Sequence, residues 1–298
     1  MPKMLMAKEG PEFSRIVQGF WRLADWNKTK QETIEFIHGC LELGITTFDH
    51  ADIYGEYRCE NLFGEAWADA LIDRQSVQIV TKCGIQLITP EHPNKSYNTS
   101  EKHILLSVDN SLRNLRTDYI DLLLIHRPDP LMNAREVASA FSKLRGSGKV
   151  KHFGVSNFLP CQFELMASAM DFPLITNQIE YSVLNMEAQA DGSVDLCQKR
   201  GIAPMAWSPF GGGRLFTDHT EQIDRLTKTL RRIGEEMGGA SIDQVALAWI
   251  LKHPVHFVPV LGSGKIERVQ SAVRSLELSM TRDQWFSIWE ASNGRDIP

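Results

Sequence analysis

Three ionisable side chains, Asp49, Lys82 and His126, stand where apolar segments end, and Tyr54 follows five residues after Asp49. A free phenol has a pKa of about 10 and is a poor proton donor at neutral pH, but a nearby ammonium stabilises its phenolate and lowers that pKa. Lys82 would act on Tyr54 in this way, with Asp49 as the counter-charge of a semi-buried lysine. His126 would donate a hydrogen bond to a substrate oxygen. The set predicts an acid–base site centred on Tyr54.

Other interpretations of these residues stay open. A single Asp, Lys, His or Tyr in a loop is usually a solvated surface residue. His126, Asp49 and His50 are also candidate metal ligands, but the sequence has no HxH pair or HExxH helix there, and Lys82 is a poor neighbour for a bound cation.

The elements that would position these residues are eight short apolar runs that alternate with segments of helical period. This alternation predicts an α/β fold, a (β/α)₈ TIM barrel, because closing eight parallel strands removes both unpaired sheet edges. An open doubly wound sheet is the alternative. The expected strands are Ile16–Trp21, Thr46–Asp49, Val77–Lys82, Ile120–His126, Phe153–Ser156, Leu174–Gln178, Ile202–Trp207 and Val258–Leu261.

A barrel of this type has its active site at the carboxyl ends of the strands. Asp49, Lys82 and His126 end three consecutive expected strands, and neighbouring strands lie about 4.8 Å apart. We therefore expect these three side chains to surround one point, with Tyr54 folding back over it from the loop.

The helical segments have recognisable ends. Thr33–Leu43 stops at Gly44, Ser100 begins a helix, and Ser241 precedes a helix over Ile242–Lys252. Outside the eight units we expect a strand pair within Met1–Glu12, across the barrel bottom, and a terminal helix over Thr281–Ser292. No linker divides the chain, so residues 1–298 are expected to form one domain.

Composition excludes several function classes. The 298 residues are 43% hydrophobic and 23% charged, with a net charge of −5. This charge does not favour nucleic-acid binding, and no apolar run reaches the ~20 residues that cross a bilayer. The five scattered cysteines form no CxxC pair and suit reduced thiols. We expect a cytoplasmic protein, monomeric, with a small-molecule partner.

Two glycine-containing loops could hold a phosphate. Barrels often bind phosphate after strands seven and eight, where backbone N–H groups and helix N-termini meet the anion. Neither loop matches the GxGxxG or P-loop pattern, and both could be simple turns. The first comprises Trp207, Ser208, Pro209, Phe210, Gly211, Gly212, Gly213 and Arg214, and the second Gly262, Ser263, Gly264, Lys265, Ile266, Glu267 and Arg268.

Three long segments resemble the signatures of the aldo-keto reductases. They run from Gly44 to Gly55 (GITTFDHADIYG), from Leu112 to Pro128 (LRNLRTDYIDLLLIHRP) and from Lys149 to Phe158 (KVKHFGVSNF). The resemblance extends over almost the whole chain. It implies a (β/α)₈ reductase that transfers hydride from a nicotinamide cofactor to an aldehyde or ketone, with Tyr54 as proton donor and Asp49, Lys82 and His126 completing a tetrad.

The resemblance also implies a cofactor site. Ser156, Asn157 and Gln178 would hold the nicotinamide carboxamide, and Trp207, where the family often has Tyr, would stack on the ring. Ser263, Lys265 and Arg268 would bind a 2′-phosphate, which favours NADPH over NADH. Four residues after Arg268, however, Ala272 stands where the family often has Asn.

Phe20, Trp21 and Trp26 are expected to wall the pocket, with Phe20 and Trp21 next to the cofactor; that they simply cap the barrel is equally open. A rival function is a nucleotide-binding regulatory protein on the same barrel with little turnover, and a metal-dependent hydrolase is a third.

Overall fold

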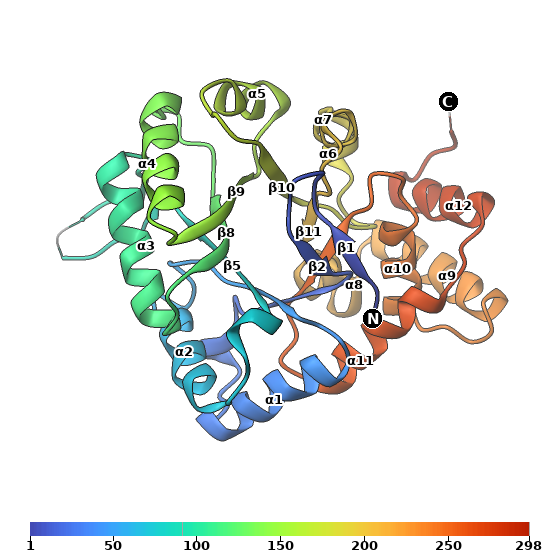
Figure 1. Ribbon diagram of the computed structural model, residues 1–298. Helices are drawn as coiled ribbons and strands as arrows, with labels where there is room; N and C mark the ends of the chain where they lie inside the picture. Colours follow the sequence, from blue (N-terminus) through green and yellow to red (C-terminus); the bar gives the residue numbers. More distant parts are fainter. Residues whose placement is uncertain (91, 298) are drawn as a thin grey trace.

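The computed structural model describes residues 1–90 and 92–297. Eight parallel strands form a closed barrel (Figure 1), in which the last strand pairs with the first through Val260 and Val17. The predicted barrel is confirmed, and the open doubly wound sheet is excluded. In order around the barrel the strands are β3 (Val17–Gly19), β4 (Thr47–Asp49), β5 (Gln78–Cys83), β8 (Ile120–Ile125), β9 (Val150–Ser156), β10 (Leu174–Glu180), β11 (Met205–Trp207) and β12 (Val258–Leu261).

Seven of the eight strands differ from the expected ranges at one or both ends, by at most three residues, and only β12 has the expected range. β3 ends at Gly19, and the Phe20 N–H makes the last bond of its ladder with β4, to the Asp49 carbonyl at 2.9 Å. β11 begins at Met205 instead of Ile202, since Pro204 has no N–H to donate. All six residues of β8 are buried, as expected for a strand covered on both faces.

Helices surround the barrel as Figure 1 shows. α1 begins at Lys30, three residues before the expected start, because Thr29 and Glu32 form a capping box. Ser100 and Ser241 are N-caps as predicted. The helices are α1 (Lys30–Glu42), α2 (Cys59–Asp69), α3 (Glu101–Leu115), α4 (Ala134–Gly146), α5 (Pro160–Ser168), α6 (Glu187–Ala190), α7 (Ser193–Arg200), α8 (Arg214–Thr217), α9 (Glu221–Glu236), α10 (Ile242–Leu251), α11 (Ile266–Arg274) and α12 (Arg282–Asn293).

The predicted strand pair and terminal helix are both present. β1 (Lys3–Leu5) pairs with β2 (Glu12–Ser14), which lies slightly later than expected. The Ala203 N–H donates to the Met6 carbonyl at 2.8 Å, so the pair is joined to the segment that enters β11, at the amino end of the barrel. In α12, Trp285 stacks on Trp249 with ring centroids 4.9 Å apart, which attaches this helix to α10.

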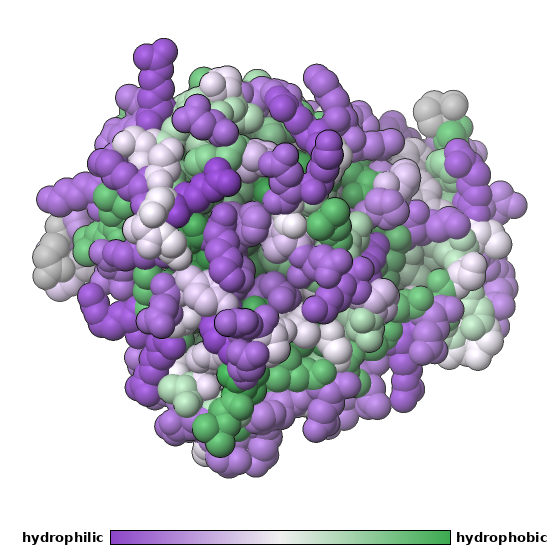
Figure 2. Space-filling model, in the orientation of Figure 1, coloured by the Kyte–Doolittle hydropathy of each residue, from purple (hydrophilic) through white to green (hydrophobic). Residues whose placement is uncertain are grey.

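A pair of short strands was not predicted from the sequence. The short strands β6 (Ile85–Gln86) and β7 (Ser96–Tyr97) pair after β5, so they extend the loop at its carboxyl end. Within the described residues, no helix has the length and apolarity to cross a membrane. Figure 2 shows apolar side chains in small areas between hydrophilic ones on the face it presents.

Gly64 lies where α2 packs closely against α3. A Cβ there would overlap the Asn114 carbonyl oxygen and lie 2.9 Å from the Leu115 carbonyl carbon, both backbone atoms of the end of α3. Gly64→Ala should therefore lower the free energy of unfolding by about 3 kcal/mol, the upper range for overpacked sites. Chemical denaturation measures this change.

Gly146, the last residue of α4, provides the matched control. A Cβ at Gly146 meets no atom within 4 Å. Gly146→Ala should stabilise the protein by about 0.5 kcal/mol, because alanine loses less backbone entropy in a helix. Equal effects of the two substitutions would contradict the close approach of α2 and α3.

Candidate active site

Lys82, Asp49 and Tyr54 meet at the carboxyl ends of β4 and β5. The Lys82 Nζ donates to Asp49 Oδ2 at 2.7 Å, to the His50 carbonyl at 2.7 Å and to the Tyr54 hydroxyl at 3.2 Å. Lys82 and Asp49 have side chains only 1% and 3% exposed. The three N–H groups of the ammonium are thus committed, and Tyr54 is the outermost of its partners.

Backbone bonds of the loop after β4 bring Tyr54 to this position. The His50 and Asp52 N–H groups donate to the carbonyls of Val80 and Lys82, which keeps the chain alongside β5. The Tyr54 N–H then donates to the Ala51 carbonyl at 3.1 Å, so the loop folds back. The predicted return of Tyr54 over the strand ends is therefore present.

The pKa of Tyr54 corrects one expectation from the sequence. Burial raises this pKa above its ordinary value of 10.0 and outweighs the lowering by the Lys82 charge. The ammonium acts in the expected direction, but desolvation of the phenolate is the larger effect. Burial also works against the charge of Lys82, yet the Asp49 carboxylate and Tyr54 together raise the pKa of this amine.

His126 lies beside Tyr54, with ring centroids 5.8 Å apart. Burial, followed by the Lys82 charge, lowers the pKa of His126 well below 6.5, so the imidazole is neutral at physiological pH. Its Nδ1 is buried without a hydrogen-bond partner. A neutral imidazole offers one N–H donor to a substrate oxygen.

His50 does not join this site through its side chain. Its ring stacks on Phe20 with centroids 5.0 Å apart, and both ring nitrogens are buried without partners. Burial lowers the pKa of His50 to about 3. No group of three or more potential metal-ligating residues occurs in the described part of the chain, so nothing there supports the metal interpretation of His126, Asp49 and His50.

A series of hydrogen bonds connects the ends of β9, β10 and β11 to this site. The Gln178 Nε2 donates to Asp49 Oδ1 at 2.8 Å, and the Ser156 hydroxyl donates to the Gln178 carbonyl at 2.8 Å. The Asn157 Nδ2 donates to Ser156 Oγ, while Asn157 Oδ1 accepts from Trp207 Nε1 at 2.9 Å. Gln178 therefore also fixes the carboxylate that holds Lys82, a role that the sequence did not indicate.

Backbone strain occurs at two of these strand ends. Asn157 has φ of 60° and Ser208 has φ of 50°, both in the left-handed region that residues other than glycine rarely adopt. Such conformations persist where the surrounding structure imposes them, often at functional sites. They turn the chain sharply after β9 and β11, at the barrel mouth.

The loop after β11 is closed against the first loop of the barrel. Its glycines form a 3₁₀ turn, η3 (Gly211–Gly213), with φ from 58° to 104°. The exposed Arg22 donates through Nη2 to the Gly212 carbonyl at 2.9 Å, and Arg214 Nε donates to the Gly211 carbonyl at 3.0 Å. Arg22 was missed from the sequence because its partner lies 190 residues away.

The loop after β12 leads into an uncapped helix. Ser263 Oγ accepts from the Lys265 N–H at 3.2 Å, and Lys265, the N-cap residue of α11, makes no side-chain cap. Within the described residues the N–H groups of Ile266 and Glu267, the first two of α11, have no hydrogen-bond partner and can meet an anion, with Lys265 and Arg268 exposed beside them. Gly264 has another reason to be glycine, since a Cβ there would lie 2.7 Å from Trp26 Cε2.

The first-loop aromatics separate into two groups. Phe20 is fully buried among Phe36, Phe48, Phe63 and Trp26, so its side chain belongs to the core and does not border the barrel mouth. Trp21 is 52% exposed and its ring lies 6.3 Å from that of Tyr54. Trp21 keeps the expected position beside the site, whereas the half-buried Trp26 packs on Phe20 and Phe36.

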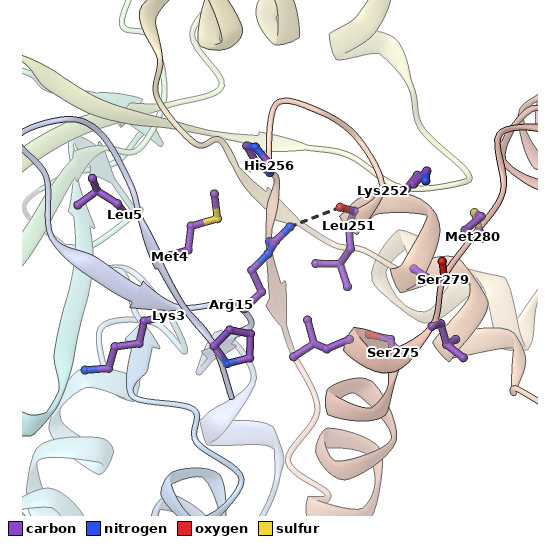
Figure 3. A pocket seen from close by; sticks show the side chains of 14 residues that line it. Lys3, Met4, Leu5, Arg15, Leu251, Lys252, His256, Ser275, Ser279 and Met280 are labelled. Carbon is purple, nitrogen blue, oxygen red and sulfur yellow. Dashed lines mark hydrogen bonds between the residues drawn. The ribbon is translucent and has the colours of Figure 1, made fainter.

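A cavity of about 620 Å³ lies elsewhere, at the amino end of the barrel (Figure 3). Arg15, which precedes β3, occupies its centre and donates to the carbonyls of Leu251 and Phe257. These contacts place a cation at the carboxyl end of α10, where the helix dipole favours it. The cavity contains none of the predicted site residues, and we assign it no catalytic role.

The comparisons with known proteins agree with this geometry. The model of the Aldo/keto reductase family matches residues 15–293. The chain is 50% identical to the uncharacterized oxidoreductase YcsN of Bacillus subtilis, over 97% of this chain and 98% of that protein. It is 44% identical to a 6-dehydroglucose reductase of Agrobacterium fabrum, over 96% of both.

A solved structure extends the likeness to three dimensions. The thermostable aldo-keto reductase Tm1743, in complex with the inhibitor epalrestat, superposes with a TM-score of 0.84 at 27% identity, covering 98% of this chain and all of that one. The matches span nearly the whole sequence and include the strand ends that carry the buried lysine and its tyrosine. The chain therefore belongs to the aldo/keto reductase family.

Proposed function

We propose that this protein reduces aldehyde or ketone carbonyls to alcohols with NADPH, and that Tyr54 supplies the proton. The observation that carries the proposal is the 3.2 Å contact between the Tyr54 hydroxyl and a buried ammonium whose other bonds are fixed. The similarity to named oxidoreductases supports the same reaction type.

Tyr54 has the protonation state that this reaction needs. Its raised pKa keeps the phenol protonated through the neutral range. Negative charge that develops on a carbonyl oxygen makes that oxygen a strong base, and Lys82 stabilises the phenolate left behind. The neutral His126 would orient the oxygen through an N–H donor.

The strand ends and loops fit a nicotinamide dinucleotide. When bound, this cofactor supplies the hydride. Ser156, Asn157 and Gln178 would hold the carboxamide and Trp207 would stack on the ring. Ser208, Pro209, Phe210, Gly211, Gly212, Gly213, Arg214 and Gly262 would surround the phosphates. Trp21 would border this site.

The free N–H groups at the start of α11 suit an anion, and Ser263, Lys265 and Arg268 add a donor and two charges there. We therefore favour NADPH over NADH.

The remaining proposals concern the setting of the enzyme. We propose a single-domain monomer in the cytoplasm that acts on a small-molecule carbonyl substrate and binds no nucleic acid. Cys40, Cys59, Cys83 and Cys197 are buried free thiols, which suits a reducing compartment. The carbonyl group of 6-dehydroglucose, the substrate named for a relative, is compatible with the proposed reaction.

Replacement of the phenol tests the proposed reaction. Tyr54→Phe should lower kcat for NADPH-dependent aldehyde reduction by about 10²- to 10⁴-fold, the usual contribution of a positioned general acid. The dissociation constant for NADPH, measured by fluorescence quenching, should change little. Tyr57→Phe is the matched control. Tyr57 lies in the same loop as Tyr54, but its hydroxyl accepts from the Leu87 N–H, so this substitution should not affect kcat.

Retained kcat in Tyr54→Phe would contradict the role of this residue. NADPH binding by the wild type without turnover of any aldehyde or ketone would instead favour the nucleotide-binding regulatory function.

The cofactor preference has its own test. Arg268→Met should weaken NADPH binding by about 10- to 100-fold, the effect of losing one charge-assisted hydrogen bond, and leave NADH binding nearly unchanged. Arg274→Met, at the other end of α11, is the control. Equal weakening of both cofactors would count against a 2′-phosphate site at the start of this helix.

A further inference from the structure

Arg127 is a half-buried cation at the barrel mouth with no polar partner. It follows His126 directly after β8, and its guanidinium carbon lies 5.6 Å from the centroid of the Trp207 ring. Among residues 1–90 and 92–297 it makes no hydrogen bond or ion pair. A guanidinium carries five N–H donors, so stacking on an indole accounts for its position and leaves these donors without a protein partner in the described chain.

Neighbouring cations of the mouth differ from Arg127 in this respect. Lys82 is bound to Asp49, and Arg22 and Arg214 donate to the carbonyls of the η3 turn. Glu180, at the end of β10, is close enough for the Arg127 charge to lower its pKa, but no ion pair within 4.0 Å joins the two. Arg127 is therefore free to bind a ligand.

The position of Arg127 relates it to the reacting carbonyl. Its ring neighbour Trp207 donates to Asn157, which in turn donates to the His126 carbonyl at 3.4 Å. The Arg127 charge lowers the pKa values of both Tyr54 and His126. These are the two groups proposed to contact the carbonyl oxygen, and Arg127 directly follows His126 at the carboxyl end of β8, which places it beside the proposed reaction site.

A second cation adds to this field. Lys95, an exposed residue just before β7, also lowers the pKa of His126 through its charge. Guanidinium and ammonium groups bind carboxylate, phosphate and hydroxyl oxygens. A substrate with an alkyl chain in place of these oxygens would leave the Arg127 donors without partners. Sites built around polar donors discriminate strongly against analogues that lack the matching oxygen.

We propose that Arg127 selects carbonyl substrates that carry further oxygen groups, carboxylate or hydroxyl, near the reacting carbon, in preference to alkyl aldehydes. This inference rests on the proposed reductase function and names the substrate class of that same site.

Three four-carbon aldehydes test the proposal: butanal, erythrose and succinic semialdehyde. All three have four carbons. Butanal carries no further oxygen, erythrose carries hydroxyl groups, and succinic semialdehyde carries a carboxylate. The value of kcat/KM is measured for the wild type, Arg127→Met and Arg127→Lys, and each variant is compared with the wild type on the same substrate. Arg231→Met, on the exposed face of α9, is the control, and NADPH dissociation constants and melting temperatures are measured for all proteins.

We expect Arg127→Met to lower kcat/KM for at least one oxygen-bearing aldehyde by about 10- to 100-fold, with less than about a threefold change for butanal. Arg127→Lys should restore part of the loss. Loss on succinic semialdehyde alone identifies a carboxylate as the recognised group, whereas loss on both shows that hydroxyl groups suffice; either result supports the proposal.

Equal loss on all three aldehydes would overturn the proposal and assign Arg127 to the proton-transfer step. A loss explained by weaker NADPH binding would overturn it in favour of a cofactor contact, and unchanged kinetics would overturn it outright. Absence of turnover of every aldehyde by the wild type would contradict the reductase function itself, and the inference with it.

Discussion

A buried ammonium needs a compensating charge, and this constraint explains much of the site. Lys82 and Asp49 are almost completely shielded from water, and removing one member of such a pair typically destabilises a protein by about 3–5 kcal/mol. The barrel provides the geometry that makes the pair tolerable, because adjacent parallel strands bring the two side chains to 2.7 Å. The Tyr54 hydroxyl therefore contacts an ammonium that its bond to Asp49 holds in place.

The same constraint extends around the barrel through Gln178. This residue donates to the carboxylate oxygen that Lys82 leaves free, and its own carbonyl accepts from Ser156. The carboxylate is thereby held from both sides, by β5 and by β10. The ends of β9 and β10 are thus connected to the lysine through a series of hydrogen bonds.

The sequence predicted those parts of the molecule that depend on local pattern. Strand periodicity, the caps at Ser100 and Ser241, and the polar residues after apolar strands indicated the barrel and the meeting of Asp49, Lys82 and Tyr54. Contacts between distant segments were not predicted, since nothing near Arg22 or Gly212 in the chain indicates their bond. Phe20 was assigned to the pocket because an aromatic residue in a loop gives no sign of which way it points.

The direction of the Tyr54 pKa was wrong for a different reason. Charge effects can be inferred from residue types, but desolvation depends on how much protein surrounds the hydroxyl, which only the folded structure reveals. The central claim is that Lys82 stabilises the Tyr54 phenolate despite this burial. The direct measurement is a pH titration of the Tyr54 ring by NMR, with labelled tyrosine, in the wild type and in the Lys82→Met/Asp49→Asn double variant, which lacks both members of the ion pair. The account predicts a higher Tyr54 pKa in the double variant, because its phenolate has lost the ammonium; a pKa equal to or below that of the wild type would contradict it.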